Sequence, residues 1–360
     1  GLYAINFLWS PLVDRIQIPY LSKRIGHRKS WILSMQFFIL LLLITWSTLN
    51  PSEDLWLVIA VGLGIAISSA TQDITIDALR IEQIDENEGR AMAAGAAISV
   101  VGWWTGYKIG GVISLVSADF FQRQGYENYW QLSFLLLGLI ILITSFALIF
   151  VPEKSSKIRS LNQKKKDDVL LKKLKINNRA SKFLVWLYGT IINPLVSFFK
   201  KNSFSVAVGI LSFIFLFKIG EAFLGRMSII FYKELGFSKT DIALYSKGIG
   251  WLTTITFTLL GGLFAIRMGL LKAMFVSGIV MALTNLMFSV LAWVGQSEIL
   301  FAFTVLIDDL AAAFATVAFV GFISALVDRT YTATQYALLA SIGTAGRTLF
   351  ASSSGTLVDW

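Results

Sequence analysis

The sequence predicts an all-α membrane protein that crosses the bilayer many times. Apolar runs of about 20 residues recur along the 360 residues, and a helix needs about that length to cross a bilayer. Charged residues make up only 15% of the chain, whereas a typical soluble domain holds about 25%. Basic residues also gather in alternate loops. Together these observations exclude an ordinary soluble protein and a protein with a single span.

Ten spans are expected from the apolar runs. The first is partial, because an apolar helix from Gly1 to Val13 would rise only about 20 Å, and the hydrocarbon core is about 30 Å thick. We therefore expect the sequence to begin inside a membrane helix. In chain order, the predicted spans are residues 1–14, 30–49, 55–79, 91–117, 129–151, 204–226, 241–265, 272–294, 300–326 and 335–358.

The loops between these spans alternate in charge. One set holds 23 of the 31 Lys and Arg residues, and the opposite set holds 3. Basic loops mark the cytoplasmic side of a membrane protein, so the net charge of +9 indicates topology and attraction to anionic lipid rather than nucleic-acid binding. The basic set comprises residues 15–29, 80–90, 152–203, 266–272 and 327–334.

The basic stretch 152–203 divides the chain into two groups of five spans. Within it, residues 183–199 form an apolar segment that Gly189 and Pro194 interrupt and that Lys182 and Lys200 flank. We expect this segment to lie in the membrane interface as a helix. If it spanned the bilayer instead, every later loop would change sides.

The layout predicts three parts: residues 1–151 as an N-terminal helical half, 152–203 as a cytoplasmic basic linker with an interfacial helix, and 204–360 as a C-terminal helical half. This is a 6+6 arrangement of helices without its first and last members, as in the major facilitator fold, where substrate binds between the halves. The stretch DRIQIPYLSKRIGHRK (14–29) resembles the loop signature of that fold, although its spacing is longer.

Five further stretches carry a more specific resemblance: FLWSPLVDR (7–15), SATQDITIDALR (69–80), EGRAMAAGAAISVVGWWTG (88–106), ELGFSKTDIALYSKGIG (234–250) and TATQYALLASIGTAGR (332–347). Together they resemble the AmpG-type muropeptide permeases, a bacterial family within the major facilitator superfamily that is similar to the acetyl-coenzyme A transporters. The resemblance covers nearly the whole chain in matching order.

The resemblance implies import of anhydromuropeptides across the bacterial inner membrane, driven by the proton gradient, by a multi-pass protein expected to be a monomer surrounded by lipid. Another anionic metabolite, such as acetyl-coenzyme A, remains an alternative substrate. A non-transporting fragment or membrane sensor is an alternative of a different class. The family carries a basic residue near the position of Trp104, and here Lys108 lies one turn further on.

Charged residues inside predicted spans are the candidate functional residues, because a charge at the bilayer centre costs at least about 2.5–3.5 kcal/mol. Asp73 and Asp77 are four positions apart, hence on one helical face near the cytoplasmic end. We expect Asp77 to pair with Arg15 or Arg80 in a cytoplasmic gate network that also contains Asp14. Asp73 could belong to that network or face the cavity and couple protons.

A second group is expected deeper in the membrane. Lys218 and Glu221 are three apart, and we predict that substrate competing for Lys218 releases Glu221 to take a proton; a simple ion pair within the helix is the alternative. Asp308 is a further candidate for proton coupling. The predicted contacts for substrate are Arg347, Lys247, Lys108 and Lys218 for carboxylates, and Trp103 and Trp104 for sugar rings. Packing roles, or pairing of Arg347 with Asp308 or Asp309, are the alternatives.

No motif of an enzyme stands out. The chain has no cysteine, which excludes disulfides and thiolate metal sites. Its one histidine, His27, lies in the charged stretch GHRKS and is expected to be a solvated loop residue. No nucleophile–base pair or phosphate-binding loop is present, so we expect neither an enzyme nor a cofactor or metal.

Overall fold

A computed structural model describes residues 2–50, 52–154, 157–174, 179–218, 231–232, 234–236 and 250–352. These residues are helical or form turns and loops, and none of them lies in a strand. Among the described residues, seven helices are long and apolar enough to cross a membrane, judged by length and composition. An all-α fold is the expected outcome for segments whose backbone polar groups must be satisfied without water.

The chain forms two compact units. Unit 1 contains residues 1–83, 109–204 and 327–338, and unit 2 contains residues 84–108, 205–326 and 339–360. Helices α5 (Gly89–Arg123) and α15 (Thr332–Ser352) therefore each contribute residues to both units. The start of α15 belongs to unit 1, although it lies far along the sequence from the rest of that unit.

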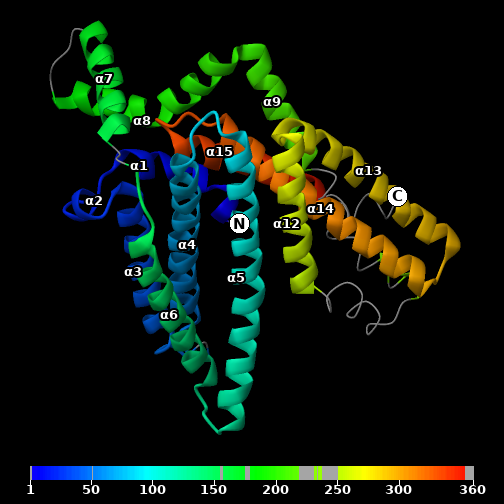
Figure 1. Cartoon of the computed structure of the whole chain (residues 1–360). Helices are drawn as coiled ribbons and strands as arrows, with labels where there is room; N and C mark the ends of the chain where they lie inside the picture. The colour runs from blue at the N-terminus through cyan, green and yellow to red at the C-terminus, as the bar shows by residue number, and fades with distance from the viewer. Residues whose placement is uncertain are drawn as a thin grey trace. The chain divides into compact units, whose positions relative to one another are not determined.

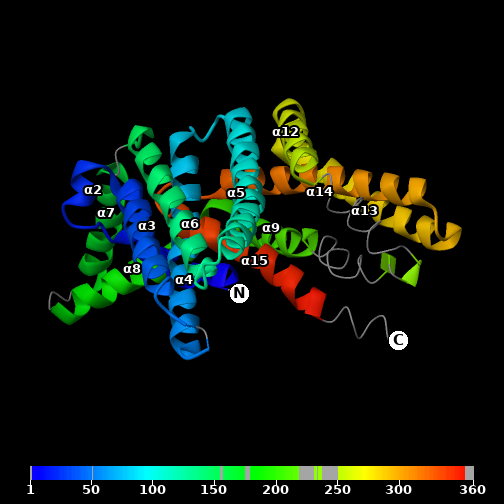
Figure 2. The ribbon, with the colours of Figure 1, turned by 90° about the horizontal axis from the view of Figure 1, so that it is seen from below.

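Unit 1 is built on three long helices, α3 (His27–Trp46), α4 (Leu55–Gln83) and α6 (Tyr129–Ala147). Helix α3 packs against both α4 and α6, and the view from below shows the three side by side (Figure 2). The remaining elements of this unit are η1 (Leu2–Ala4), η2 (Asn6–Leu8), α1 (Ser10–Arg15), α2 (Leu21–Arg24), η3 (Leu148–Phe150), α7 (Lys157–Leu174) and α8 (Arg179–Asn202).

The predicted first span differs from the expectation of one continuous helix. Residues 2–15 form two short 3₁₀ turns followed by α1. Pro11 falls at the start of α1, where its missing N–H costs no hydrogen bond. Val13 packs with Ile74 and Ala78 of α4 and with Ala333 and Ala337 of α15, and this contact fixes the end of α1 beside the start of α15.

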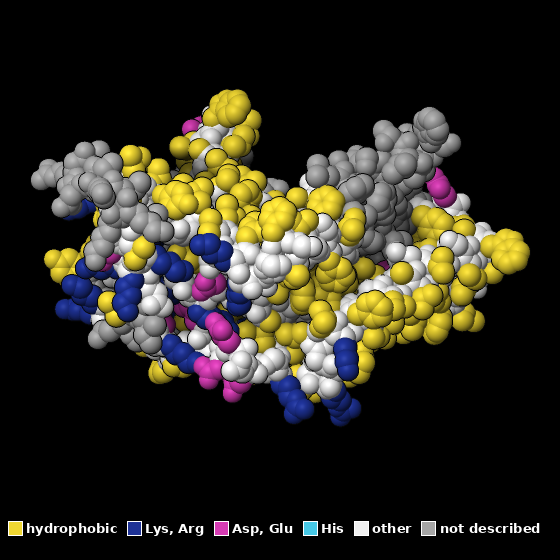
Figure 3. Space-filling view, turned by 90° about the horizontal axis from the view of Figure 1, so that it is seen from above, with side chains coloured by type: hydrophobic (Ala, Val, Ile, Leu, Met, Phe, Trp, Pro, Cys, Tyr) yellow, Lys and Arg dark blue, Asp and Glu magenta, His cyan; other side chains and the backbone are white. Residues whose placement is uncertain are grey.

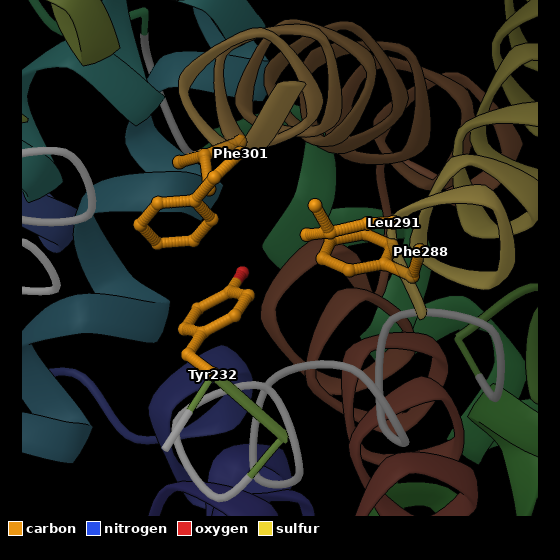
Figure 4. Close-up of a cluster of buried hydrophobic side chains, with 5 residues drawn as sticks. Tyr232, Phe288, Leu291 and Phe301 are labelled. Atoms are coloured by element: carbon orange, nitrogen blue, oxygen red, sulfur yellow. The ribbon is translucent and has the colours of Figure 1, made fainter. Parts of the chain in front are cut away.

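Unit 2 contains α9 (Phe204–Phe217), α12 (Gly250–Met268), α13 (Leu270–Val294) and α14 (Glu298–Leu326). Helix α14 packs against both α12 and α13, as the ribbon shows (Figure 1). At one end of α13 and α14, Tyr232 packs with Phe288, Leu291 and Phe301 (Figure 4).

Helix α5 reaches the core of unit 2 through small residues. A Cβ added at Gly262 of α12 would lie 2.5 Å from the Cβ of Ala97, and one added at Gly321 of α14 would lie 3.5 Å from the Cβ of Ala96. Only glycine fits at Gly262, because real Cβ atoms do not approach so closely. This packing holds α5 against α12 and α14 and positions its next charged residue, Lys108.

Candidate functional site

Four charged side chains meet in unit 1, and we call them the Asp14 cluster: Asp14, Arg28, Glu82 and Arg159. Arg28 Nη2 lies 2.5 Å from Asp14 Oδ1 and 2.7 Å from Glu82 Oε1. Arg159 Nη1 also lies 2.7 Å from Glu82 Oε1. The side chain of Arg28 is 0% exposed, so its buried charge needs these carboxylate partners, and its Nη1 also donates to the carbonyl of Val13 at 3.2 Å.

Asp14 also holds the N-terminus of α15. Its Oδ2 accepts hydrogen bonds from the backbone N–H of Thr334 at 2.8 Å and from the hydroxyl of Thr334 at 2.6 Å. Its Oδ1 accepts from the N–H of Ala333 at 3.2 Å. A carboxylate at this position satisfies donors that have no partner within the helix and interacts favourably with the helix dipole.

The linker helix α7 contacts the Asp14 cluster along one face. Arg159, Gln163 and Asp167 follow one another at the spacing of a helical turn. The Nε2 of Gln163 donates to the carbonyl of Thr330 at 3.0 Å, and Asp167 pairs with Arg15. The linker is therefore bonded both to α1, near the start of the sequence, and to the loop before α15, near its end.

The second linker helix, α8, contacts the same region. Pro194 O accepts a hydrogen bond of 2.8 Å from Gln335 Nε2, and the hydroxyl of Ser197 donates to Asp328. A Cβ added at Gly189 would meet Asp167 Oδ1 at 2.5 Å, so α8 lies directly against α7 there. Figure 3, a view from above, shows acidic and basic side chains gathered over unit 1.

Loop residues near the cluster have shifted pKa values. Burial raises the pKa of Asp328, but hydrogen bonds from Ser197 and Thr330 outweigh it and hold this pKa below the ordinary 3.8. Burial raises the pKa of Tyr331 to about 12, and the ammonium group of Lys166 lies 4.7 Å from the centre of its ring. Asp328 is therefore an ionised hydrogen-bond acceptor at neutral pH.

The four residues predicted for a gate network all lie in this region. Arg80 Nη2 pairs with Asp77 Oδ1 at 2.9 Å, one of the two pairings expected for Asp77, while Arg15 pairs with Asp167 instead. The sequence interpretation did not include Arg28, Glu82, Arg159 or Gln163. The signals for them in the sequence are the basic stretch that contains Arg28 and the basic linker that contains Arg159 and Gln163.

The expectation for His27 was wrong. The residue is 1% exposed, and its Nε2 lies 2.8 Å from the carbonyl oxygen of Val13. The charges around it in the sequence do not surround it with water, because Arg28 turns inward to Asp14 and Glu82. His27 therefore anchors the start of α3 to the end of α1.

Asp73 lies one turn before Asp77 on α4, and the two carboxyl groups interact electrostatically. Other polar groups lie nearby on the same helix. Tyr3 Oη and Ser69 Oγ are 2.6 Å apart, and Trp9 Nε1 donates to Thr71 Oγ1 at 2.9 Å. The proton-coupling role of Asp73 stays a prediction.

Unit 2 contains a second polar group, which we call the Lys108 cluster: Lys108, Trp104, Thr254 and Asp309. Lys108 Nζ donates to Thr254 Oγ1 at 3.0 Å and lies 5.3 Å from the ring centre of Trp104. Asp309 of α14 interacts with it electrostatically. The cluster brings together a cation, an aromatic ring, a hydroxyl group and a carboxyl group from three helices.

The two predicted tryptophans differ in their surroundings. Trp104 packs against the apolar cluster of Ala97, Val100 and Val317 and also contacts Lys108. Trp103 is 53% exposed and stacks on Tyr107 with a centroid separation of 5.6 Å. Trp103 and Tyr107 thus present an aromatic surface beside the Lys108 cluster.

The remaining predicted residues make other contacts or lie outside the described residues. Asp308 Oδ1 accepts a hydrogen bond of 3.2 Å from Thr284, and Lys218 Nζ lies 5.0 Å from the ring centre of Phe319. Lys247 and Glu221 lie outside the described residues, as does the side chain of Arg347. The adjacent Asp309 interacts electrostatically with Lys108.

Two further features bear on possible ligands. No group of three or more His, Cys, Asp or Glu side chains that could hold a metal occurs among the described residues. A cavity of about 730 Å³ opens beside α9 and α13. With one cationic residue, it is poorly suited to a ligand with several carboxylates. It is lined by Val206, Gly209, Ile210, Phe213, Met268, Leu271, Lys272, Phe275, Val276 and Phe322.

Comparison with solved structures gives the same fold. A proton:xylose symporter, XylE, aligns over 99% of this chain and 77% of its own, with a TM-score of 0.61 and 16% identity. The human organic anion transporter MFSD10 aligns over 98% and 75%, with a TM-score of 0.62 and 15% identity. At these identities the likeness shows the fold alone.

Sequence comparison is more specific. "Putative transporter AmpG 4" of Rickettsia felis is 34% identical over 94% of this chain and 75% of its own length. "Anhydromuropeptide permease" of Escherichia coli K12 is 29% identical over 99% of this chain and 65% of its own length. The model of the Major Facilitator Superfamily matches residues 2–351. The chain therefore belongs to the Major Facilitator Superfamily and, within it, to the AmpG-type transporters, as the sequence motifs predicted.

Proposed function

We propose that this multi-pass transporter imports anhydromuropeptides across the bacterial inner membrane together with protons. The observation that carries the proposal is the Lys108 cluster. Its ammonium group suits the carboxylates of a muropeptide, and the neighbouring surface of Trp103 and Tyr107 suits the faces of amino-sugar rings. The name of the Escherichia coli relative supports this substrate class.

Proton coupling is proposed to follow from competition for Lys108. Without substrate, Lys108 stabilises the ionised form of Asp309, since an opposite charge nearby favours ionisation. A substrate carboxylate that binds Lys108 removes this support, and Asp309 then takes a proton. Substrate and proton therefore bind together, and release of one favours release of the other. Asp308, predicted from the sequence for proton coupling, is the alternative to Asp309, and the predicted roles of Asp73 and Glu221 would add further proton sites.

The Asp14 cluster is proposed to act as a cytoplasmic gate. Buried ion pairs join its residues from the N-terminal half to Arg159 of the linker. Asp14 reaches the C-terminal half through hydrogen bonds from Ala333 and Thr334. The ion pairs of such a group can be formed in one conformation and broken in another, so the group is suited to control an alternating-access cycle. The excess of Lys and Arg in its loops supports a cytoplasmic position.

The proposal can be tested by counterflow of labelled anhydromuropeptide in proteoliposomes that hold the purified protein. We expect Lys108→Ala to lower the exchange rate about tenfold to a hundredfold, because a hydrogen bond to a charged group contributes about 1.5–3 kcal/mol. Lys108→Arg should retain part of the rate. Arg123→Ala, at an exposed position, serves as the surface control.

Two results would overturn parts of the proposal. Exchange of labelled acetyl-coenzyme A, with none of the anhydromuropeptide, would show that the substrate class is wrong. Wild-type exchange of anhydromuropeptide by Lys108→Ala would show that the Lys108 cluster is not the binding site.

Imposed pH gradients then test proton coupling in the wild-type protein, which should accumulate substrate on the side of higher pH.

A further inference from the structure

Helix α8 has two chemically different faces. One face carries Gly189, Asn193 and Ser197; it packs against Asp167 of α7 at Gly189 and donates a hydrogen bond from Ser197 to Asp328. The opposite face carries Leu184, Tyr188, Ile191 and Leu195, which follow helical spacing. Leu184 is 61% exposed and Ile191 is 47% exposed. The helix thus leaves an apolar face bare while its polar face is fixed to the rest of unit 1.

Basic residues flank this bare face. Lys182 precedes it, Lys200 and Lys201 follow it, and all three are exposed. Lysine side chains at the ends of an apolar helix face can reach lipid phosphates while the apolar residues enter the acyl region. The charge and the apolar surface together fit an anionic bilayer surface, because a second copy of α8 would bring these lysines close to one another.

The polar face of α8 links this surface to the start of α15. The helix uses its Pro194 carbonyl to bind Gln335 and its Ser197 hydroxyl to bind Asp328. Gln335 also accepts a hydrogen bond from the backbone N–H of Asp328, at 2.6 Å. One residue earlier in α15, Thr334 binds Asp14. Any interaction that fixes the position of α8 therefore also stabilises the contact between Asp14 and the start of α15.

We propose that the apolar face of α8 docks on anionic lipid of the cytoplasmic leaflet, and that docking stabilises the bonds between the linker, Asp14 and the start of α15. Anionic lipid is then a regulator of this transporter, because it favours the conformation in which the bonds of the Asp14 cluster are formed. The cytoplasmic location rests on the proposed topology, whereas the docking itself depends only on a membrane around the protein.

The first experiment locates α8 relative to the bilayer. Because the chain has no cysteine, Ile191→Cys provides a single labelling site. A fluorophore there should be quenched by brominated lipid in nanodiscs that contain phosphatidylglycerol. A fluorophore on Lys164→Cys, an exposed position of α7, should be quenched much less. Equal, weak quenching at both sites would overturn the docking.

The second experiment measures hydrogen exchange of the backbone amides of residues 330–335 and needs no substrate. We expect exchange to slow severalfold when phosphatidylglycerol replaces part of a phosphatidylcholine bilayer. Leu184→Asp combined with Ile191→Asp should abolish the effect, whereas Leu161→Asp, at an exposed leucine of α7, should retain it. Each Lys→Ala change at 182, 200 or 201 should weaken membrane association of α8 roughly fivefold.

The outcomes separate this inference from the proposed function. Equal exchange rates in both lipids would overturn the lipid regulation even if anhydromuropeptide transport were confirmed. Crosslinking between two copies of the Ile191→Cys variant in dilute nanodiscs would show that a second protein, rather than lipid, covers the face. Slower exchange in phosphatidylglycerol would support the inference even if the substrate proved to be different.

Discussion

Asp14 binds the N-terminus of α15 at Thr334, a residue 320 positions away in the sequence, with a distance of 2.8 Å from Oδ2 to the backbone nitrogen. The same carboxyl group pairs with the buried guanidinium of Arg28. One side chain therefore caps a helix and neutralises a buried charge. A carboxylate in two such roles cannot be replaced by either an apolar or an uncharged polar residue without loss.

Asp14→Ala should lower the free energy of unfolding by about 3–5 kcal/mol, because Arg28 loses one buried partner and α15 loses its cap. Asp14→Asn should cost less, since its amide oxygen can still accept from Thr334. Thermal unfolding in detergent measures both. The control is Asp119→Asn, whose exposed pair with Arg123 contributes at most about 1 kcal/mol. Equal stability of Asp14→Ala and this control would show that Asp14 neither caps α15 nor stabilises the buried charge of Arg28.

Glu82→Gln should also destabilise the protein by several kcal/mol, because Arg28 and Arg159 share this one carboxylate. Adding Arg159→Gln to this variant removes one of the two buried guanidinium charges, those of Arg28 and Arg159. The double variant should therefore be less destabilised than the sum of the single variants, which a double-mutant cycle measures. Strict additivity would mean that Glu82 and Arg159 do not interact in solution.

Asp328 predicts a particular pH dependence. Its pKa is lower in the folded protein than the ordinary 3.8. Its contribution to the free energy of unfolding is therefore present above pH 3.8 and is lost as pH falls through the folded pKa. The stability difference between wild type and Asp328→Asn should thus be constant from pH 7 to about 5 and shrink below about 4. Thermal unfolding across this range checks it, with the exposed Asp54→Asn as control. A difference that grows on acidification would have the wrong sign.

The helical fold could be predicted from the sequence, because a run of about 20 apolar residues has few other structures available in lipid. The described part of each expected span is mainly α-helical, except that residues 2–15 begin with 3₁₀ turns; the span 129–151 ends in one, and α3 ends at Trp46, before the expected residue 49. The pair Asp77 and Arg80 was also predictable, since residues three apart share a helical face. Local spacing is sufficient for inferences of this kind.

The contacts of Arg28 and Asp309 could not be predicted in the same way. Arg28 lies in a basic loop stretch that reads as solvated, and its partners Asp14 and Glu82 come from other helices. Asp308 and Asp309 are adjacent, and the sequence does not say which of them turns toward Lys108. Such choices depend on how helices pack, and packing is set by small residues such as Gly262 and Ala97 that carry no functional signal of their own.

The approach of α5 to α12 predicts a rescue experiment. Gly262→Ala should destabilise unit 2 by about 1–3 kcal/mol, because the new Cβ would lie 2.5 Å from the Cβ of Ala97. Adding Ala97→Gly should restore much of the loss. Gly111→Ala, where a Cβ would meet no described atom within 4 Å, should be neutral or slightly stabilising. Thermal unfolding of the four proteins tests this, and failure of the rescue would show that the two helices do not meet there.

Asp309→Asn should uncouple transport from the proton gradient. The amide cannot take up a proton, yet it keeps the ammonium group of Lys108 in place to bind a substrate carboxylate. Counterflow, which needs no net proton movement, should therefore continue, while accumulation driven by a pH gradient should fall to the level of simple equilibration. Asp308→Asn is the matched control, because Asp308 is bonded to Thr284 and, on this proposal, does not exchange with substrate at Lys108. Gradient-driven accumulation that persists in Asp309→Asn and is lost in Asp308→Asn would transfer the coupling role to Asp308, as the sequence interpretation had it.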